Sequence, residues 1–454
     1  MNIRINGLPN EQYVRAPRVT QFRRNGFFVF QEPSTHLNPR MPIIQQLQEG
    51  DLAAENDQQT ILSGLWSEPP DSRNHSATRD LQRQELLHAV LHTYPSPFRP
   101  SGGEKQRILL AMALKKLHLV PPELETLYVL DEPTGSLDDA RRDVFLNMLF
   151  AEFQRRPFTI LFITHDYSII SQMYRHFEHL IPETVFHELK RTSGRFVKMI
   201  AFAPDRYLKW IAELKPVKSS VRKAKPVLRI DSDYRVFGRR LSLFRAGDSN
   251  QPASLELFPG QMAYLKAPSG LGKTTLVKSV MGFIKPDRLR AELCGFPVSE
   301  KTPANFWAKQ IWGRRAGLVF QHADEALNPK STVFQTFVGL PLKKRLTRDM
   351  LLSALQEIFE AKLSPSFLDQ KVAHLSGGQK QRLNIMRTLI IDLELVILDE
   401  PFNGLDLSAV KKVLSIINRK RRNGTAFLVI AHNEEIFSRL IPEQSTYLLE
   451  AVEE

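Results

Sequence analysis

The sequence contains a single cysteine, Cys294, among its 454 residues, which excludes an internal disulfide and any cysteine-rich zinc or iron–sulfur site. It contains no apolar run of about 18 residues, the length that a membrane-spanning helix needs. The first residues also lack the apolar core of a secretion signal. With 42% hydrophobic and 24% charged residues, the composition is that of a globular protein. We expect it to work in the reducing cytoplasm.

Acidic residues are the scarcer charge, with 49 Asp and Glu against 62 Lys and Arg and a net charge of +13. A basic balance suits nucleic acid, a ribosome or an anionic membrane face as partner, but it also suits a merely solvated surface. Many of the excess positive charges lie in the stretch "LKPVKSSVRKAKPVLRI", which indicates a short exposed linker. The simpler interpretation is a solvated hinge between the two halves. The more specific alternative is that the basic residues of this linker lie near an anionic membrane surface.

An internal repeat organises the chain. The first half contains "FFVFQEPSTHLNPR", "PSGGEKQRILLAMAL", "LYVLDEPTGSLDD" and "ILFITHD". The second half contains "GLVFQHADEALNPK", "LSGGQKQRLNIMRTL", "LVILDEPFNGLD" and "AFLVIAHNE" in the same order. Four ordered blocks that occur twice predict two related domains in tandem.

The apolar runs "TLYVL", "TILFI", "ELVIL" and "AFLVI" predict buried parallel strands, and the stretches after each "SGG" have helical spacing. Their alternation predicts an α/β fold, with two tandem P-loop cassettes that each carry a helical subdomain. We expect the first cassette over residues 1–208, the basic linker over 209–226 and the second cassette over 227–454.

The stretch "APSGLGKTTL" fits the phosphate-binding pattern G-x-x-x-x-G-K-[ST], except that Ala267 replaces the first glycine. Backbone N–H groups of such a loop cradle phosphate, the lysine reaches the β- and γ-phosphates, and the hydroxyl that follows binds Mg²⁺. Because its methyl group matters only at a positive φ or in very close packing, we expect Ala267 to weaken binding rather than abolish it. The predicted contacts of ATP are Ala267, Pro268, Ser269, Gly270, Leu271, Gly272, Lys273, Thr274 and Thr275.

Polar residues that follow the predicted strands complete this candidate site. Asp399 is placed to hold Mg²⁺ through water, together with Thr274 and Gln321. Glu400 can orient or deprotonate the attacking water. Gln321 and His432 are expected to position that water and to contact the γ-phosphate. The predicted cofactors are ATP and Mg²⁺.

Together these blocks resemble the ATP-binding cassette (ABC) ATPases, whose signature sequence is "LSGGQKQR", and the resemblance covers nearly the whole chain. The form "VFQ…LNP" in both halves is most similar to ATPase subunits of bacterial oligopeptide, dipeptide and nickel importers, although the cysteine-bearing tail of many such subunits is missing. The resemblance implies ATP hydrolysis that energises transport, with membrane-spanning subunits and a substrate-binding protein as partners. It also implies a place on the inner face of the cell membrane and no direct contact with nucleic acid.

In ABC ATPases two cassettes close head to tail on ATP, either within one chain or in a homodimer. The resemblance therefore implies that Ser101, Gly102 and Gly103 complete the site at Lys273. Phe237, or alternatively Tyr234, is implied as the ring that stacks on adenine, and Asp406 and Asp138 match the interface aspartate. The remaining motif residues would form a degenerate second site, and these are Gln31, Asp131, Glu132, His165, Ser376, Gly377 and Gly378.

Only the second half has a phosphate loop, because the 30 residues before Gln31 contain no G-K-[ST]. Two explanations stay open, a fragment of a longer protein with two loops or a natural machine with one site. In either case we expect the first cassette to lack its N-terminal strands, to expose sheet edge and core, and to be unstable unless another segment covers them.

Three other functions remain as alternatives. A ribosome-associated tandem-cassette factor would also be basic, but it would carry a longer charged linker. A DNA-repair cassette ATPase would carry zinc sites or long coiled coils. The last alternative is an inactive remnant.

Overall fold

The computed structural model describes residues 4–5, 8–9, 12, 27–29, 37–38, 41–48, 61–65, 102–119, 127–135, 137, 139–191, 197–217, 225–268, 270–431 and 434–452. The chain divides into two compact units, residues 1–166 and 167–454. Among the described residues, no helix combines the length and the apolar character that crossing a membrane requires.

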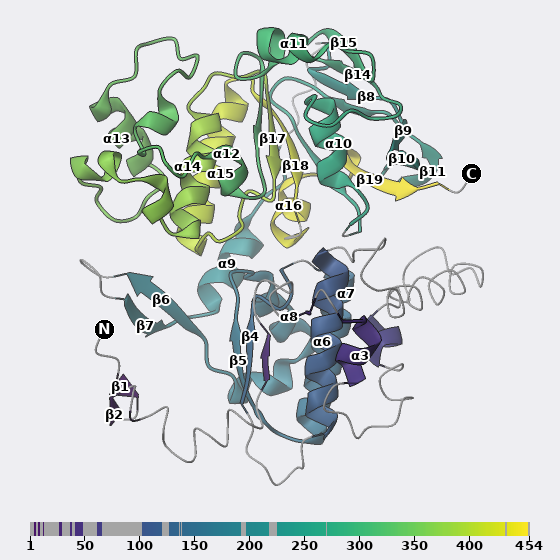
Figure 1. Ribbon diagram of the computed structural model, residues 1–454, viewed down its shortest axis with the longest axis vertical. Coiled ribbons are helices and arrows are strands. Elements are labelled where there is room, and N and C mark those ends of the chain that lie inside the picture. Colours follow the sequence, from purple (N-terminus) through teal and green to yellow (C-terminus); the bar gives the residue numbers. More distant parts are fainter. Residues whose placement is uncertain are drawn as a thin grey trace. The chain divides into compact units, whose positions relative to one another are not determined.

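The second unit is built on a mixed sheet with the strand order β11-β10-β19-β13-β18-β17-β16. Its strands β17, β18, β19, β10 and β11 are labelled in Figure 1. Its parallel strands are β13 (Met262–Lys266), β16 (Ala316–Val319), β17 (Leu395–Asp399) and β18 (Ala426–Ile430). Strand β19 (Thr446–Ala451) runs parallel to β13 and antiparallel to β10 (Arg239–Arg245). Every residue of β17 and β18 is buried, as their continuous apolar runs predict.

Antiparallel strands extend this unit beyond the parallel core. Strand β10 also pairs with β9 (Asp233–Val236) and with β11 (Asp248–Pro252). A separate four-stranded sheet has the order β12-β8-β14-β15, with bounds Leu255–Leu257, Leu228–Ile230, Arg290–Leu293 and Phe296–Ser299. Leu228 and Ile230 of β8 are buried.

Two hydrophobic clusters cover the two faces of the parallel strands. Alternation along β18 assigns Phe427 and Val429 to one cluster and Leu428 and Ile430 to the other. The first cluster is shared with α13 (Arg348–Gln356), α14 (Gly377–Leu389), α15 (Leu407–Arg422) and α16 (Glu434–Leu440). The second is shared with α10 (Lys273–Val280) and the four-stranded sheet. Short helical segments connect these elements, at Ala304–Phe306 (α11), Trp307–Ile311 (η3), Ala323–Ala326 (α12), Gln335–Phe337 (η4), Pro365–Asp369 (η5), Val372–His374 (η6) and Glu443–Ser445 (η7).

Residues 167–217 belong to the second compact unit although they follow the blocks of the first repeat. They form α8 (Ser168–His176), η2 (Glu178–Glu183), the β6–β7 hairpin (His187–Arg191 and Val197–Ala201) and α9 (Asp205–Glu213). Tyr207 and Ile211 of α9 are buried in the first hydrophobic cluster. The predicted linker at 209–226 therefore begins inside a helix, which is a correction. The outer limits of the two cassettes stay a prediction.

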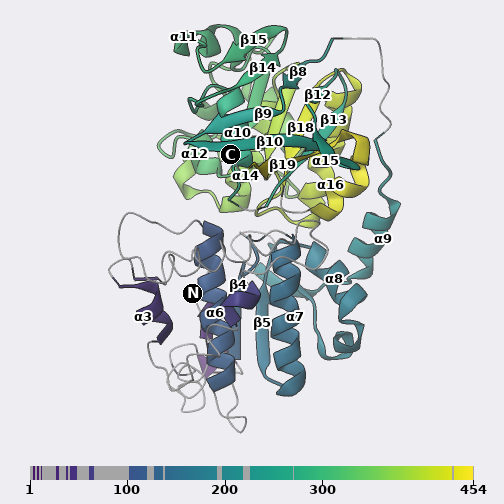
Figure 2. The same ribbon diagram turned by 90° about the vertical axis from the view of Figure 1, so that its right-hand side faces the viewer.

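The first unit contains a smaller parallel sheet of β3 (Phe27–Val29), β4 (Leu127–Asp131) and β5 (Thr159–Ile163). Helices α6 (Gly102–Leu119) and α7 (Asp139–Arg155) lie side by side (Figures 1 and 2). Other described elements are α3 (Ile43–Gln48), β1 (Arg4–Ile5), β2 (Leu8–Pro9) and a helical segment at 61–65.

The prediction that "TILFI" is a buried strand is wrong in one respect. The segment does form the parallel strand β5, but Leu161 is 51% and Ile163 is 41% exposed. Their counterparts in the second unit, Leu428 and Ile430, are 0% and 1% exposed. The difference arises because β18 lies between β17 and β13, whereas among the described strands β5 pairs only with β4.

Candidate functional site

The phosphate loop connects the end of β13 to the start of α10. Gly270 and Gly272 have φ values of 81° and 112°, which side chains rarely adopt, so both glycines are required for backbone reasons. Gly272 is the N-cap of α10, and the helix begins at Lys273. The Lys273 side chain is 8% exposed and its Nζ donates to the Ala267 carbonyl at 2.5 Å. The ammonium group is thereby held at the loop, where the helix N-terminus also favours an anion.

The backbone at Ala267 does not need the positive φ that only glycine adopts easily. Its φ is not among the positive values of the described residues, and its side chain packs against the second hydrophobic cluster. The alanine therefore fits this backbone without strain.

Two carboxylates lie at the end of β17. Asp399 is the last residue of the strand and is 1% exposed. Glu400 is 5% exposed and has a φ of 47°, and its backbone N–H donates to the Ile430 carbonyl at 2.9 Å. A positive φ is unfavourable for a glutamate and is typical of residues held in place for function.

Parallel strands bring these groups to one edge of the sheet. Because β13, β17 and β16 share one direction, the phosphate loop, Asp399 with Glu400, and Gln321 all lie beyond carboxyl ends of the same sheet. Gln321 follows Phe320, whose carbonyl accepts from Asn384 Nδ2 of α14 at 2.8 Å. Two predicted members, His432 and Ser269, lie outside the described residues.

The signature turn of the second unit is a fully formed helix cap. The Ser376 hydroxyl accepts from the Gln379 N–H, and the Gln379 side chain accepts from the Ser376 N–H at 2.9 Å. A Cβ at Gly378 would lie 2.6 Å from the Gly404 carbonyl oxygen, whereas one at Gly377 would meet open space. Gly378 is therefore needed for close contact with the loop that follows Glu400.

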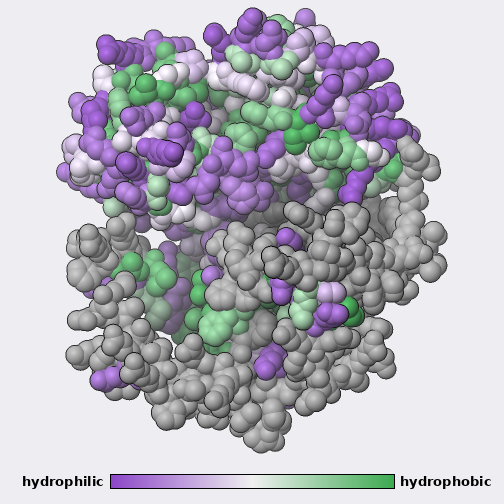
Figure 3. Space-filling model, in the orientation of Figure 1, coloured by the Kyte–Doolittle hydropathy of each residue, from purple (hydrophilic) through white to green (hydrophobic). Residues whose placement is uncertain are grey.

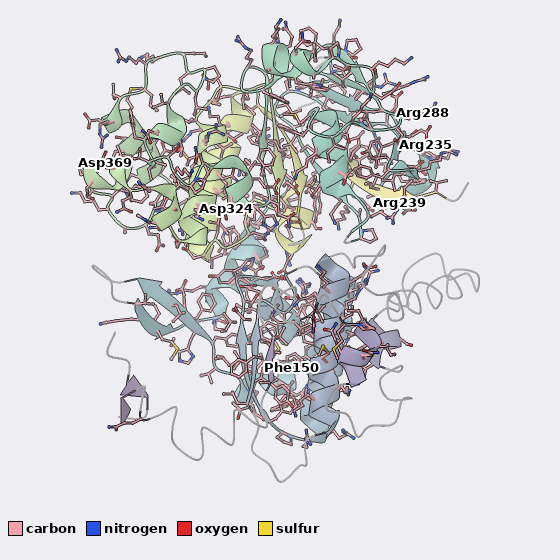
Figure 4. The ribbon with its side chains drawn as sticks, in the orientation of Figure 1. Phe150, Arg235, Arg239, Arg288, Asp324 and Asp369 are labelled. Atoms are coloured by element: carbon pink, nitrogen blue, oxygen red, sulfur yellow. The ribbon has the colours of Figure 1, made fainter. Side chains whose placement is uncertain are left out.

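Asp406 fixes the next helix. Its Oδ1 accepts from the Ala409 N–H at 2.8 Å, which caps α15, and its Oδ2 accepts from Arg382 of the signature helix. Another contact between these segments joins Asp324, on α12 after Gln321, to Lys380 of α14 at 2.8 Å (Figure 4). The residues around the site are thus tied to the signature helix.

The predicted adenine contact lies at the tip of the β9–β10 hairpin. Phe237 is 73% exposed, with a φ of 51°, and is accessible to a ligand ring. Arg235 and Arg239 come from the same hairpin (Figure 4). Tyr234 cannot take this role, because it is buried and its hydroxyl lies 2.9 Å from Ser279 Oγ. Burial raises the pKa of Tyr234 to about 12.

The first unit repeats the acidic part of the site. Glu132 has a φ of 49°, and its N–H donates to the Ile163 carbonyl at 2.9 Å, as Glu400 does to Ile430. His165 Nδ1 lies 2.7 Å from the Glu132 carboxylate. Burial and the charge of Glu132 raise the pKa of Asp131.

The signature turn of the first unit is only partly described. Gly102 and Gly103 begin α6, as predicted, while Ser101, Gln31 and Asp138 lie outside the described residues.

Sequence reasoning missed a set of contacts from residues 167–217 to the second repeat. The Tyr167 hydroxyl accepts from the Leu407 N–H at 3.1 Å, next to the cap at Asp406. The Tyr207 hydroxyl donates to Glu435 Oε2 of α16 at 2.8 Å, and Arg175 pairs with the same carboxylate. The aromatic residues of this segment indicate that it packs against another part of the protein. The sequence does not show which part that is.

The donor set suits Mg²⁺ bound together with phosphate. Thr274, Gln321 and the buried Asp399 offer oxygen ligands, which this hard cation prefers. Among the described residues, no group of three or more His, Cys, Asp and Glu side chains is placed to hold a metal. Mg²⁺ usually takes few protein ligands and fills its shell from water and phosphate.

A phosphate loop before a helix, an acidic pair after a buried parallel strand, and a capped signature helix together define an ATP-binding cassette of the P-loop class. Comparison with known proteins agrees, since residues 250–403 match the sequence model of the ABC transporter family. This part of the chain is an ABC transporter ATPase domain.

The similarity to individual proteins covers both repeats. The glutathione import ATP-binding protein GsiA of Pectobacterium atrosepticum is 25% identical over 453 residues, covering 91% of this chain and 68% of that protein. The uncharacterized ABC transporter ATP-binding protein YejF of Escherichia coli K12 is 27% identical over 429 residues, covering 91% and 75%.

Solved structures confirm the fold. The RNase-L inhibitor aligns with a TM-score of 0.58 at 17% identity, covering 98% of this chain and 81% of that one. The archaeal ribosome recycling factor aABCE1, in complex with the ribosomal stalk protein aP1, aligns with a TM-score of 0.55 at 18% identity, covering 93% and 73%. At these identities the likeness shows the fold alone.

Proposed function

We propose that this protein is the ATP-hydrolysing subunit of an ABC importer and that it works through one complete ATP site at Lys273. The observation that supports this most strongly is the common position of the phosphate loop, the buried Asp399 and the strained Glu400 at one sheet edge. All three belong to a domain of the ABC ATPase type.

ATP binding begins at the loop. Lys273 exchanges its contact with the Ala267 carbonyl for phosphate oxygens, and backbone N–H groups of residues 270–274 face the same phosphates. Phe237 stacks on the adenine ring at the hairpin tip. Thr274, Asp399 and Gln321 would hold Mg²⁺, which supplies charge neutralisation at the phosphates when it is bound.

Hydrolysis depends on the groups beyond β17 and β18. Glu400 orients the attacking water and accepts its proton, and His432 contacts the γ-phosphate. The left-handed backbone at Glu400 fixes the direction of its side chain before ATP arrives. Preorganisation of this kind is what a positioned general base requires.

Closure of two cassettes completes the site. In the proposed head-to-tail arrangement, Ser101, Gly102 and Gly103 cap the γ-phosphate from the other side, within one chain or in a homodimer. Two positive helix ends then face each other, so phosphate must lie between them for closure to be stable. ATP binding and hydrolysis would therefore drive closing and opening.

The importer assignment rests on relatives. GsiA is named for glutathione import, which makes glutathione or another peptide the proposed cargo class, with nickel as the other cargo that the sequence resemblance implies. Membrane-spanning subunits and a substrate-binding protein are the proposed partners, and the protein would act on the inner face of the cell membrane. Co-purification with membrane subunits encoded by neighbouring genes tests this; stable isolation with ribosomes instead would favour the ribosome-associated alternative.

The ATP site itself is tested with two lysines on one helix. Lys273→Ala should lower ATP turnover to background, because the loop loses its phosphate contact. Lys278→Ala is the matched control, since Lys278 lies on the same α10 but pairs with Glu325 at 2.7 Å. We expect this control to keep most of the turnover in a phosphate-release assay. Equal turnover in both variants would remove Lys273 from the site.

A further inference from the structure

The hairpin of β6 and β7 presents an apolar face to solvent. Its register sets Leu189 opposite Met199, and Val197 lies on the same face because it is two residues before Met199. Leu189 is 71%, Met199 is 67% and Val197 is 57% exposed, and Val185, shortly before β6, is 81% exposed. Figure 3 shows apolar surface, in green, where β6 and β7 lie at the left of Figure 1. An exposed apolar patch of this kind indicates a contact surface for another molecule.

The opposite face of this hairpin is already packed. Phe186 and Phe202 extend the two strands by one pair, since the Phe202 N–H donates to the Phe186 carbonyl at 2.9 Å. Both side chains pack against the first hydrophobic cluster, and the centroid of the Phe202 ring lies 5.7 Å from that of Tyr167. A hairpin that is packed on one face normally carries polar side chains on the other. Packing within the protein therefore does not account for the apolar side chains of Leu189 and Met199.

Positive charge accompanies the apolar face. The sequence between residues 187 and 201 contains one acid, Glu188, and four basic residues, which are Lys190, Arg191, Arg195 and Lys198. Lys198, which lies between Val197 and Met199, is exposed. Apolar side chains next to basic ones complement a surface that is negatively charged outside and hydrocarbon inside. An anionic lipid bilayer has this structure.

The size of the patch also favours a bilayer over a protein as the partner. Four apolar side chains of on the order of 100 Å² each fall short of the roughly 800 Å² that each partner buries in a stable protein interface. A bilayer makes no such demand, because a few apolar side chains can enter the boundary between headgroups and acyl chains. The facing backbone groups of β6 and β7 are paired with each other, so these hydrogen bonds are kept when the hairpin enters that boundary.

From these observations we propose that the β6–β7 hairpin binds directly to an anionic lipid bilayer through the side chains of Val185, Leu189, Val197 and Met199. These side chains enter the boundary between headgroups and acyl chains, while the positive charge of the hairpin attracts lipid phosphates. The packed face keeps the hairpin fixed to the second unit. This goes beyond the proposed function, in which membrane-spanning subunits bring the protein to the membrane, and it does not depend on the ATP site.

Co-sedimentation of the full-length protein with vesicles tests the proposal. The probes are vesicles of phosphatidylcholine alone and vesicles in which about one third of the lipid is phosphatidylglycerol. We expect binding to the anionic vesicles to be at least about tenfold tighter than to the neutral ones and to weaken as the salt concentration rises.

A pair of double variants separates the hairpin from the net charge of the protein. Leu189→Glu with Met199→Glu should weaken binding to anionic vesicles by about tenfold or more, because two charges would have to enter the apolar boundary. Val338→Glu with Met350→Glu is the matched control, since it adds the same charge at exposed apolar side chains elsewhere in the second unit. This control should bind the vesicles like the unmodified protein.

A fluorophore on the hairpin gives a readout that needs no charged variant. Met199→Cys is labelled with an environment-sensitive dye, while Cys294 stays unlabelled because it is buried. Its emission should shift to shorter wavelength with anionic vesicles, since the dye leaves water for the bilayer boundary. The same dye at Val338→Cys should show no shift.

The outcomes that contradict the proposal are distinct. No binding to anionic vesicles, equal binding by the two double variants, or no emission shift at Met199→Cys would each overturn it. Dimers that Leu189→Glu with Met199→Glu separates in sedimentation velocity, without vesicle binding, would instead assign this face to a second copy of the chain. Both double variants should keep the lipid-free ATP turnover of the unmodified protein, so a failure of vesicle binding is distinguishable from a failure of the ATP site.

Discussion

At the scale of single residues, the two glycines of the second signature turn differ in the space available for a side chain. Gly378 meets the Gly404 carbonyl, with only 2.6 Å available to an added Cβ, while Gly377 faces open space. The clash would push apart the signature helix and the loop that follows Glu400. Gly377 is free of this constraint within the structure.

We therefore predict that Gly378→Ala lowers the free energy of unfolding of the second unit by about 1–3 kcal/mol, the usual cost of overpacking. Gly377→Ala is the control and should change it by less than about 0.5 kcal/mol. Urea unfolding followed by tryptophan fluorescence measures both, because Trp210, Trp307 and Trp312 lie in this unit. A similar loss in both variants would show that the steric account of Gly378 is mistaken.

Residue chemistry also decides how much of the site was predictable. Strand ends followed by Asp, Glu or Gln place Asp399, Glu400 and Gln321 at one sheet edge from sequence alone. The left-handed backbone at Glu400 was not predictable, because glutamate carries no preference for it. The sequence favours Phe237 over Tyr234 as the adenine contact but does not exclude Tyr234, whereas burial of Tyr234 in the structure does.

At the scale of elements, helix α15 begins at a cap that also joins two motifs. Asp406 accepts from the Ala409 N–H and from Arg382, so one side chain links the loop after Glu400 to the signature helix. Tyr167 adds a contact at the next residue, Leu407. The start of α15 is thereby held from both sides.

Asp406→Ala should destabilise the second unit by about 1 kcal/mol or more, because the cap and the ion pair are both lost. Asp406→Asn keeps a capping oxygen and should cost clearly less, since asparagine is an equally good cap. Chemical denaturation compares the two variants. Should asparagine be as harmful as alanine, the ion pair with Arg382 rather than the cap would dominate.

The sequence predicts where the strands lie along the chain, but it does not always predict whether their side chains are buried. "LVIL" and "AFLVI" become fully buried strands, whereas the equally apolar "TILFI" becomes β5 with exposed Leu161 and Ile163. An apolar run records the environment that a strand is suited to, and its actual burial depends on neighbouring segments. For the same reason, helix α9, which runs into the start of the expected linker, was missed, because its contacts lie far away in sequence.

At the scale of the whole molecule, the reactivity of the single cysteine, Cys294, shows whether the second unit is folded. Burial raises the pKa of Cys294 to about 12, so hardly any thiolate forms near neutral pH while this unit is folded. An unfolded cysteine titrates near pH 8.5. The folded pKa is the higher one, so the stability linked to this thiol is complete below about pH 8 and is lost as the pH rises toward 12.

We predict that an aromatic disulfide reagent at pH 8 reacts with native Cys294 at least roughly a thousandfold more slowly than with the urea-unfolded protein. Protection should persist when only the first unit is unfolded, because Cys294 lies in the second. Stopped-flow absorbance measures the reaction. Rapid labelling of the native protein would mean that the second unit opens readily around β14 and β15.

The central claim is that ATP turns over at the loop of the second unit and not at the equivalent acids of the first. Glu400 and Glu132 share their strained backbone and strand contact. Among the described residues, only Glu400 has a phosphate loop on its own sheet. Steady-state ATP hydrolysis by purified Glu400→Gln and Glu132→Gln proteins compares them directly. Glu400→Gln should lower the rate by about 10²–10⁴-fold while ATP still binds, and Glu132→Gln alone should leave most of the rate. Equal losses in both, or full activity in Glu400→Gln, would contradict the account.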